Sequence, residues 1–405
     1  MKDESKRQGI RDTQSDDDEL TFSLVRNDPW YRLQRAIGLI PASRLGVVRR
    51  CLVFALVTWL PIAIWAFYWK RAFPGVVAEP LLQHFGVHVR CLVAIPLLVV
   101  AEIAGDLIPR HFVPYFVKAG LIQDDMKSQF IRILRSAERM RDRWYAWVSM
   151  LVIMLLIVVI GDKDATHLQE LIWADEGETA NVHVGFGGWW FLYVMRPLFT
   201  WLLLAWIWRL IVCLVLLWRI SRLNLHLVPT HPDRAGGLGF LEDIPIIFSP
   251  VIFASSAVLA SRWGHEVFYH DVDVYSFAIP LGVYVAAMVI MFLGPLVVFM
   301  PILRRFKRRS LLEYGALVGQ HGRLVKRRWI YQEPIPEAPL LQAAELGPVI
   351  DTVAMYEVVA QIRPAPIGKP ALLAVVLPAV VPMLPVMAIQ IPLKDVLFKL
   401  LKMLL

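Results

Sequence analysis

The chain has 405 residues, of which 57% are hydrophobic, and it contains 15 tryptophans. Its mean hydropathy of +0.55 is far above that of a soluble domain, and this excludes a soluble globular protein. We expect an all-α, polytopic transmembrane helix bundle. The net charge of +8 does not indicate a nucleic-acid partner, because the basic residues cluster beside apolar segments, where they orient the protein and meet anionic lipid.

The N-terminal region is hydrophilic, and residues 1–28 are predicted to form a disordered cytoplasmic tail. The first apolar block starts only at Cys51, too late for the apolar region of a cleavable signal peptide. The first span is therefore expected to act as the insertion signal. Cys51, Cys91 and Cys213 all lie inside apolar segments without the close spacing of a disulfide framework or a thiolate metal site, so we expect them to be core residues.

Six apolar segments approach the roughly 20 residues that a helix needs to cross a bilayer. They belong to a bundle predicted over residues 29–303, at positions 51–69, 91–108, 144–160, 198–218, 244–260 and 275–303. A seventh apolar segment, residues 371–391, lies in the C-terminal region 371–405. It is predicted to be the seventh span, but because it contains Pro378, Pro382 and Pro385, a kinked or re-entrant helix is the alternative.

Lysine and arginine are concentrated in alternate loops, which predicts a cytoplasmic N-terminus. Residues 1–50, 110–143, 219–243 and 304–369 hold 32 of the 42 lysines and arginines. The opposite loops are poor in basic residues and rich in acidic ones. Three lysines follow the seventh segment and would lie outside if it crossed, which favours re-entry: Lys394, Lys399 and Lys402.

Two further segments are predicted to be cytoplasmic helices. Near residues 124–143, apolar side chains at helical spacing lie opposite Lys127, Arg132, Arg135 and Arg139, the pattern of a basic amphipathic helix. Residues 304–370 open with six residues of which five are basic, 304–309, and continue as a helical pattern. These basic segments are expected to contact anionic lipid headgroups.

Three ionisable residues interrupt the apolar segments. Glu102 and Asp106 lie four residues apart, on one face of the second span, and Arg209 lies in the fourth. Glu102 and Arg209 are each about eleven residues, or about 16 Å, from the outer end of their segments, so an ion pair between them is predicted. The pair is either a structural link between helices or a polar element of a substrate or proton path.

The most distinctive motif is residues 230–241, THPDRAGGLGFL, between the fourth and fifth spans. One interpretation is a tight turn with Asp233 as a cap. The other is an anion-binding or gating loop, whose members would be His231, Asp233, Arg234, Gly236, Gly237 and Gly239. The segment does not match either glycine-rich nucleotide fingerprint.

The outer loop after the fifth span contains residue types that bind metals: His265, His270, Asp271 and Asp273. Their spacing matches no known ligand pattern, and a solvated loop is the expected state. The sequence therefore assigns no metal site, no cofactor and no catalytic residue.

Three blocks carry a family resemblance: WYRLQR with IGLIP at residues 30–41, the motif at residues 230–241, and EVV with IRPAP at residues 357–366. In these blocks the chain resembles a family of uncharacterised bacterial multi-pass inner-membrane proteins, over most of its length from Asp28. The resemblance implies an inner-membrane location and no established activity, so no catalytic residue is carried over.

Two main functions are compatible with the sequence. The leading hypothesis is transport or conductance of a small polar or ionic solute, in which Glu102, Asp106 and Arg209 border a continuous polar cavity. The second is a membrane scaffold or sensor without a substrate, acting through its basic cytoplasmic surfaces, especially residues 304–309. A membrane-embedded enzyme using His231 and Asp233 is a third hypothesis, without a suggested substrate. A homo-oligomer is compatible with each.

Overall fold

A computed structural model describes residues 20–41, 45–75, 79–161, 172–174, 184–333 and 347–390. Within these ranges seven helices are long and apolar enough to cross a membrane, which confirms the predicted all-α bundle. They are α3 (Val47–Tyr68), α4 with α5 (Phe85–Val89 and Ile95–Lys118), α7 (Trp144–Gly161), α9 with α10 (Phe186–Trp190 and Arg196–Ile220), α11 (Ser249–Tyr269), α12 (Ala278–Val297) and α16 with α17 (Lys369–Val380 and Leu384–Gln390).

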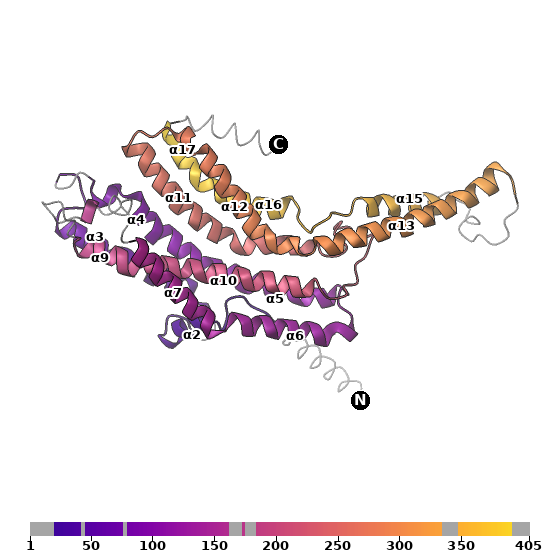
Figure 1. Cartoon of the computed structure of the whole chain (residues 1–405), viewed down its shortest axis with the longest axis horizontal. Coiled ribbons are helices and arrows are strands. Elements are labelled where there is room, and N and C mark those ends of the chain that lie inside the picture. The colour runs from indigo at the N-terminus through magenta and orange to yellow at the C-terminus, as the bar shows by residue number, and fades with distance from the viewer. Residues whose placement is uncertain are drawn as a thin grey trace.

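The long helices α5 and α10 form the centre of the bundle (Figure 1). Four further α-helices are not among these spans: α2 (Pro29–Ala36), α6 (Asp124–Arg141), α13 (Met300–Val325) and α15 (Gly347–Ala360). Helices α2, α6 and α7 lie on one side of the central pair, and α11, α12 and α16 on the other. Helices α13 and α15 pack together as an arm that projects beyond the bundle (Figure 1).

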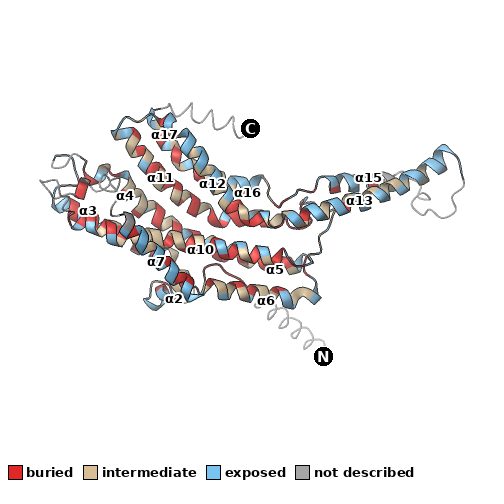
Figure 2. Ribbon diagram, viewed as in Figure 1, coloured by how far each residue is buried: buried red, intermediate tan, exposed pale blue. Residues whose placement is uncertain are grey.

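The outward faces of the long helices are apolar. On α12 the side chains of Ile279 and Ile290 are 81% and 75% exposed, and on α7 those of Leu156 and Val159 are 53% and 60% exposed; Figure 2 shows where exposed residues lie along the helices. Helices that are apolar both toward their neighbours and away from them are stable in lipid and not in water. The chain is therefore an integral membrane protein.

The two ends of the bundle are identified by loop contacts. At one end, which we call the basic end, the turn after α5 meets the connection between α10 and α11, because the His226 amide donates to Leu121 O at 2.9 Å. At the other, called the far end, the segment after α3 turns back on itself: the Leu81 amide donates to Arg71 O at 2.9 Å.

The predicted sixth span, 275–303, is wrong at its C-terminal boundary. Helix α12 ends at Val297, and α13 starts separately at Met300. Pro301 is one of the first two residues of α13, and a proline ring disfavours a helical conformation at the preceding residue while offering no amide for a continuing helix. Residues 304–309 therefore belong to the arm and not to an extended span.

Residues 20–28 are packed into the bundle, so the prediction that they belong to a disordered tail is wrong. Leu20, Phe22, Leu24 and Val25 are all at most 3% exposed. The Leu24 amide donates to the carbonyl of Gly105 on α5 at 3.1 Å. A β-carbon on Gly105 would lie 2.9 Å from Val25 Cγ2, so the glycine allows this close approach.

The last apolar segment runs the length of the bundle. At its start, Gly368 lies against Glu242 at the basic end. At its end, Gln390 Oε1 accepts from the Val274 amide at 2.8 Å and Gln390 Nε2 donates to Val272 O at 3.0 Å, at the far end. The predicted seventh span is thus among the helices long and apolar enough to cross a membrane, and the re-entrant alternative is not supported. The lysines on which it rested lie outside the described residues.

The amphipathic helix predicted near 124–143 is present as α6. Its buried face contains Phe130, Leu134 and Ala137, as the sequence predicts. This face packs on α10, so the basic side chains on the opposite face project into the surroundings.

Candidate functional site

A buried charge cluster joins the N-terminal segment to three spans. Its members are Asp28, Arg50, Glu102 and Arg209, all at most 1% exposed. Arg209 Nη2 donates to Glu102 Oε1 at 3.2 Å and to Asp28 Oδ2 at 2.9 Å. Arg50 Nη1 donates to Glu102 Oε2, and Arg50 Nε donates to Gln34 Oε1 at 2.6 Å. The ion pair predicted between Glu102 and Arg209 is therefore present, within a larger network.

Asp106 takes part in a second set of ion pairs one turn further along α5. It accepts from Arg26 Nε at 2.9 Å and from Arg110 Nη2 at 3.0 Å. Asp106 does not contact Arg209, although both were proposed to border one cavity. Each carboxylate on this face of α5 thus has two arginine partners.

The position of the cluster favours a structural role. Arg50 is the fourth residue of α3, so its partner Glu102 lies near the basic end of the first span and not at mid-depth. The side chains of Glu102 and Arg209 are each 1% exposed and that of Asp106 is 2% exposed. A continuous polar cavity bordered by these residues, which transport requires, would expose them far more.

The glycine-rich motif folds around its own aspartate. Asp233 Oδ1 accepts from the amides of Ala235 and Gly237 at 2.8 and 3.2 Å, and Oδ2 accepts from the Gly239 amide at 2.7 Å. His231 Nδ1 lies 2.8 Å from Asp233 Oδ1. Burial alone would raise the pKa of Asp233, but these amide hydrogen bonds and His231 hold its pKa below the usual value.

This arrangement matches the tight-turn interpretation of residues 230–241. The amides that could hold an external anion are occupied by the Asp233 carboxylate. Arg234, Gly236 and Gly237 have φ angles of 55°, 68° and 98°, a left-handed conformation that glycine adopts without strain. A β-carbon on Gly239 would lie 2.7 Å from Asp233 Cβ, so the turn closes tightly on the carboxylate.

The segment at residues 362–368 clamps this turn. The Arg363 amide donates to Arg234 O at 2.7 Å, and Arg363 Nη2 donates to Asp233 O at 2.8 Å. Arg363 also forms an ion pair with Glu242. The second and third of the sequence blocks that carry the family resemblance are therefore in direct contact.

The basic run at residues 304–309 divides its side chains between two faces of α13. Phe306 packs against Gly236, and Lys307 Nζ donates to Ile362 O at 2.7 Å. Four arginines of the run are exposed: Arg304, Arg305, Arg308 and Arg309. The inward half of the run thus supports the glycine-rich turn, while the outward half forms a basic strip on the arm.

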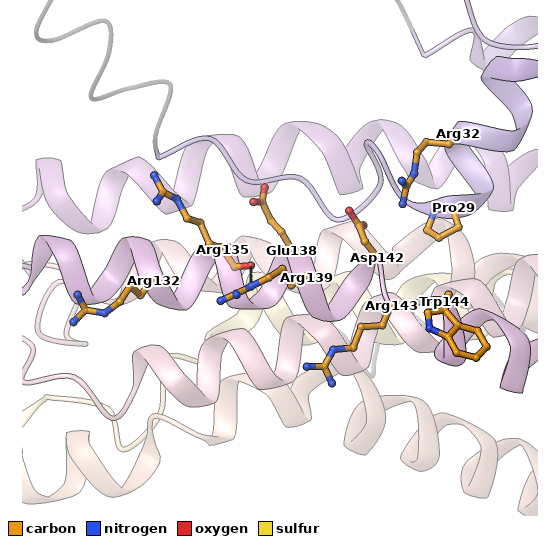
Figure 3. A pocket seen from close by; sticks show the side chains of 9 residues that line it. All are labelled: Pro29, Arg32, Arg132, Arg135, Glu138, Arg139, Asp142, Arg143 and Trp144. Carbon is orange, nitrogen blue, oxygen red and sulfur yellow. Dashed lines mark hydrogen bonds between the residues drawn. The ribbon is translucent and has the colours of Figure 1, made fainter.

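The largest basic concavity among those described lies where α2, α6 and α7 meet, and we call it the arginine groove (Figure 3). Its volume is about 1230 Å³, and its lining residues are Pro29, Arg32, Arg132, Arg135, Glu138, Arg139, Asp142, Arg143 and Trp144. The five arginines are exposed and outnumber the two carboxylates. Asp142 is already paired with Arg141 Nε at 2.7 Å, so the groove is strongly positive.

The floor of the groove is rigid. The carbonyl of Arg141, at the end of α6, accepts from the indole nitrogens of Trp147 at 3.0 Å and Trp208 at 3.3 Å. The buried guanidinium of Arg141 donates to Ser23 O. These bonds fix the corner between α6 and α7 to α10 and to the N-terminal segment, so the arginines are held on a preformed surface.

No protein-family model, curated protein or solved structure matches this chain. The resemblance carried by the three sequence blocks therefore stays a prediction, and function is inferred from the polar regions described above.

Proposed function

We propose that the protein is a membrane scaffold or sensor whose arginine groove binds an anionic lipid headgroup. The observation that carries the proposal is the groove itself, with five exposed arginines gathered around one concavity at the start of an apolar span. Guanidinium groups bind phosphate oxygens in a bidentate manner, and arginine is the residue best suited to this task.

The position of the groove supports a lipid ligand over a soluble anion. Trp144 and Tyr145, 73% and 48% exposed, begin α7 directly beside Arg143. Exposed tryptophan and tyrosine at the end of an apolar helix are typical of the membrane interface. A headgroup lying at that depth meets Arg139 and Arg143 while its acyl chains lie along α7.

Transport receives less support from the same geometry. Glu102 and Arg209 are buried and paired with each other, and the buried Asp106 is paired with Arg26 and Arg110. In line with the lysine and arginine distribution and the family resemblance, we further propose an inner-membrane location with the basic end in the cytoplasm. This orientation places the groove at the leaflet surface that carries anionic lipid.

The groove predicts a measurable loss of lipid binding. The triple variant Arg132→Gln, Arg135→Gln, Arg139→Gln should bind phosphatidylglycerol roughly 100-fold more weakly, since each basic residue near a lipid surface contributes about 1 kcal/mol. Binding is measured by native mass spectrometry of the purified chain in detergent with added phosphatidylglycerol. It should weaken as ionic strength rises, and phosphatidylcholine should bind equally to both proteins.

The matched control is Arg304→Gln, Arg305→Gln, Arg308→Gln, which removes three exposed arginines from the arm. Phosphatidylglycerol binding by this control should stay near the wild-type level. Equal losses in the two triple variants would show that total charge, and not the groove, attracts the lipid. A loss confined to the control would move the site to the arm.

A further inference from the structure

At the far end of the bundle, three side chains with metal-binding atoms converge from two distant parts of the chain. Glu79 and His84 flank the short 3-10 turn Leu81–Gln83, and His265 lies on α11, four residues before its end. One potential ligand atom from each residue lies within 4.8 Å of the other two. We propose that Glu79, His84 and His265 bind a zinc-class divalent transition-metal ion.

The two distances from the carboxylate to the imidazoles fit a tetrahedral ion. Glu79 Oε2 lies 3.5 Å from His84 Nε2 and 3.3 Å from His265 Nε2. Zinc binds nitrogen and carboxylate oxygen at about 2.0–2.2 Å, so neighbouring ligands of a tetrahedral ion are about 3.3–3.6 Å apart. Two histidines and one glutamate are also a known zinc ligand set, with the fourth position left for water.

Both imidazole rings present a nitrogen to the same carboxylate oxygen, Glu79 Oε2. The rings of His84 and His265 are stacked, with centroids 5.2 Å apart and an interplanar angle of 21°. A bound metal ion uses both imidazoles in their neutral form and supplies the positive charge that the carboxylate needs.

The surroundings are enclosed but reachable. The side chains of His84, Glu79 and His265 are 6%, 17% and 18% exposed, so the ligands are shielded while an entry path remains. Glu79 Oε2 is buried and accepts no hydrogen bond from the described residues. A buried carboxylate oxygen in that state is costly unless a cation or another donor contacts it.

Neighbouring histidines do not complete the set. His88 is fully engaged, because its Nδ1 accepts from Trp59 Nε1 at 2.9 Å and its Nε2 lies 3.1 Å from Leu81 O. The exposed His270 contacts the His265 ring at a centroid distance of 5.7 Å but is not one of the three converging residues. A metal held by the triad would tie the segment after α3 to the end of α11, independently of the arginine groove at the opposite end.

Zinc binding tests the proposal directly. The full chain is purified in detergent with its affinity tag removed, stripped with a chelator and titrated with ZnCl₂, with bound zinc counted by elemental analysis. We expect one zinc per chain. Glu79→Gln should weaken binding at least tenfold, His84→Ala with His265→Ala should abolish it, and His270→Ala should match the wild type. Cobalt added in place of zinc should give the wild type the intense visible absorption of a tetrahedral site. Glu79→Gln and the double variant His84→Ala with His265→Ala should lack this absorption.

A folding control accompanies the titration. Each variant is compared with the wild type by size-exclusion elution and melting temperature in metal-free buffer. If the double variant does not fold, the zinc content of Glu79→Gln, which keeps the shape of the side chain, tests whether the triad binds the metal. Absence of zinc from the wild type, or equal zinc content in the wild type and Glu79→Gln, would overturn the proposal. In that case the triad is a histidine–carboxylate ion-pair cluster.

Discussion

Replacement of Glu102 by alanine should lower the free energy of unfolding by about 3–5 kcal/mol, the cost of removing one partner from a buried ion pair. The carboxylate accepts from both Arg50 and Arg209. Its removal leaves the Arg50 guanidinium with Gln34 as its remaining hydrogen-bond partner among the described residues. Arg209 retains Asp28, so two buried positive charges would face one negative charge.

Thermal unfolding in detergent, followed by tryptophan fluorescence, measures this effect. For a chain of this length, a loss of this size corresponds to a melting temperature lower by about 4–6 °C. Glu102→Gln should fall between the wild type and Glu102→Ala, because the amide retains an acceptor for one arginine but no charge. Glu313→Gln is the control: Glu313 also pairs with an arginine, Arg309, at 2.7 Å, but both side chains are largely exposed, and its melting temperature should not change.

The same variants separate the two functional hypotheses. If the cluster is structural, Glu102→Gln protein that survives purification should bind phosphatidylglycerol like the wild type, because the groove does not include Glu102. If Glu102→Ala had the melting temperature of the wild type, the structural role would be contradicted. The hypothesis that Glu102 lies on a solute or proton path would then be favoured.

The sequence predicts the spans and one ion pair because hydropathy identifies the residues that lie in the hydrocarbon core of the bilayer. Glu102 and Arg209 are equally deep in their apolar segments, and this depth placed them together. The helices themselves begin well before those segments, at Phe85 and Phe186, so helix ends would have been a poor guide. Depth in the bilayer predicts which residues of neighbouring helices lie at the same level, because each helix is positioned by its apolar segment and not by its ends.

The other members of the cluster could not be placed by the same reasoning. Asp28 follows a strongly hydrophilic stretch, and the mean hydropathy of residues 1–28 does not reveal the apolar side chains between Leu20 and Val25, which are buried, as is Asp28. One local signal was present: Asp28 precedes Pro29, a capping residue followed by a proline at the first helical position. The structure realises it, with Asp28 Oδ1 accepting from the Tyr31 amide at 2.6 Å.

The proposed metal ligands illustrate a limit of linear spacing. The sequence groups His265 with His270, Asp271 and Asp273, which are its neighbours along the chain. The structure instead brings His265 to Glu79 and His84, about 180 residues earlier. Contacts between loops at one end of a bundle depend on which helices are adjacent, and periodicity within a single helix does not determine adjacency.

Replacement of Asp233 by alanine should destabilise the protein by about 2–4 kcal/mol, since three backbone amides lose a charged acceptor. The effect should reach beyond the turn. Arg363 donates to the Asp233 carbonyl, so a turn that opens also loosens the segment that leads into α16. Limited proteolysis should therefore cut Asp233→Ala near residues 230–241 and 362–368 faster than the wild type.

The pH dependence of Asp233→Asn provides the sharper measurement. The pKa of Asp233 in the folded protein lies below its usual value, so the folded state favours the ionised carboxylate. Its stabilising contribution is complete above the unfolded pKa of about 3.9 and is lost as the pH falls through the folded pKa. The difference in melting temperature between wild type and Asp233→Asn should shrink as the pH falls from about 4 toward 3. Asp243→Asn, at an exposed aspartate of the same connection, should show no such difference. A gap between wild type and Asp233→Asn that persists unchanged at pH 3 would mean that the amides are held by the shape of the side chain and not by its charge.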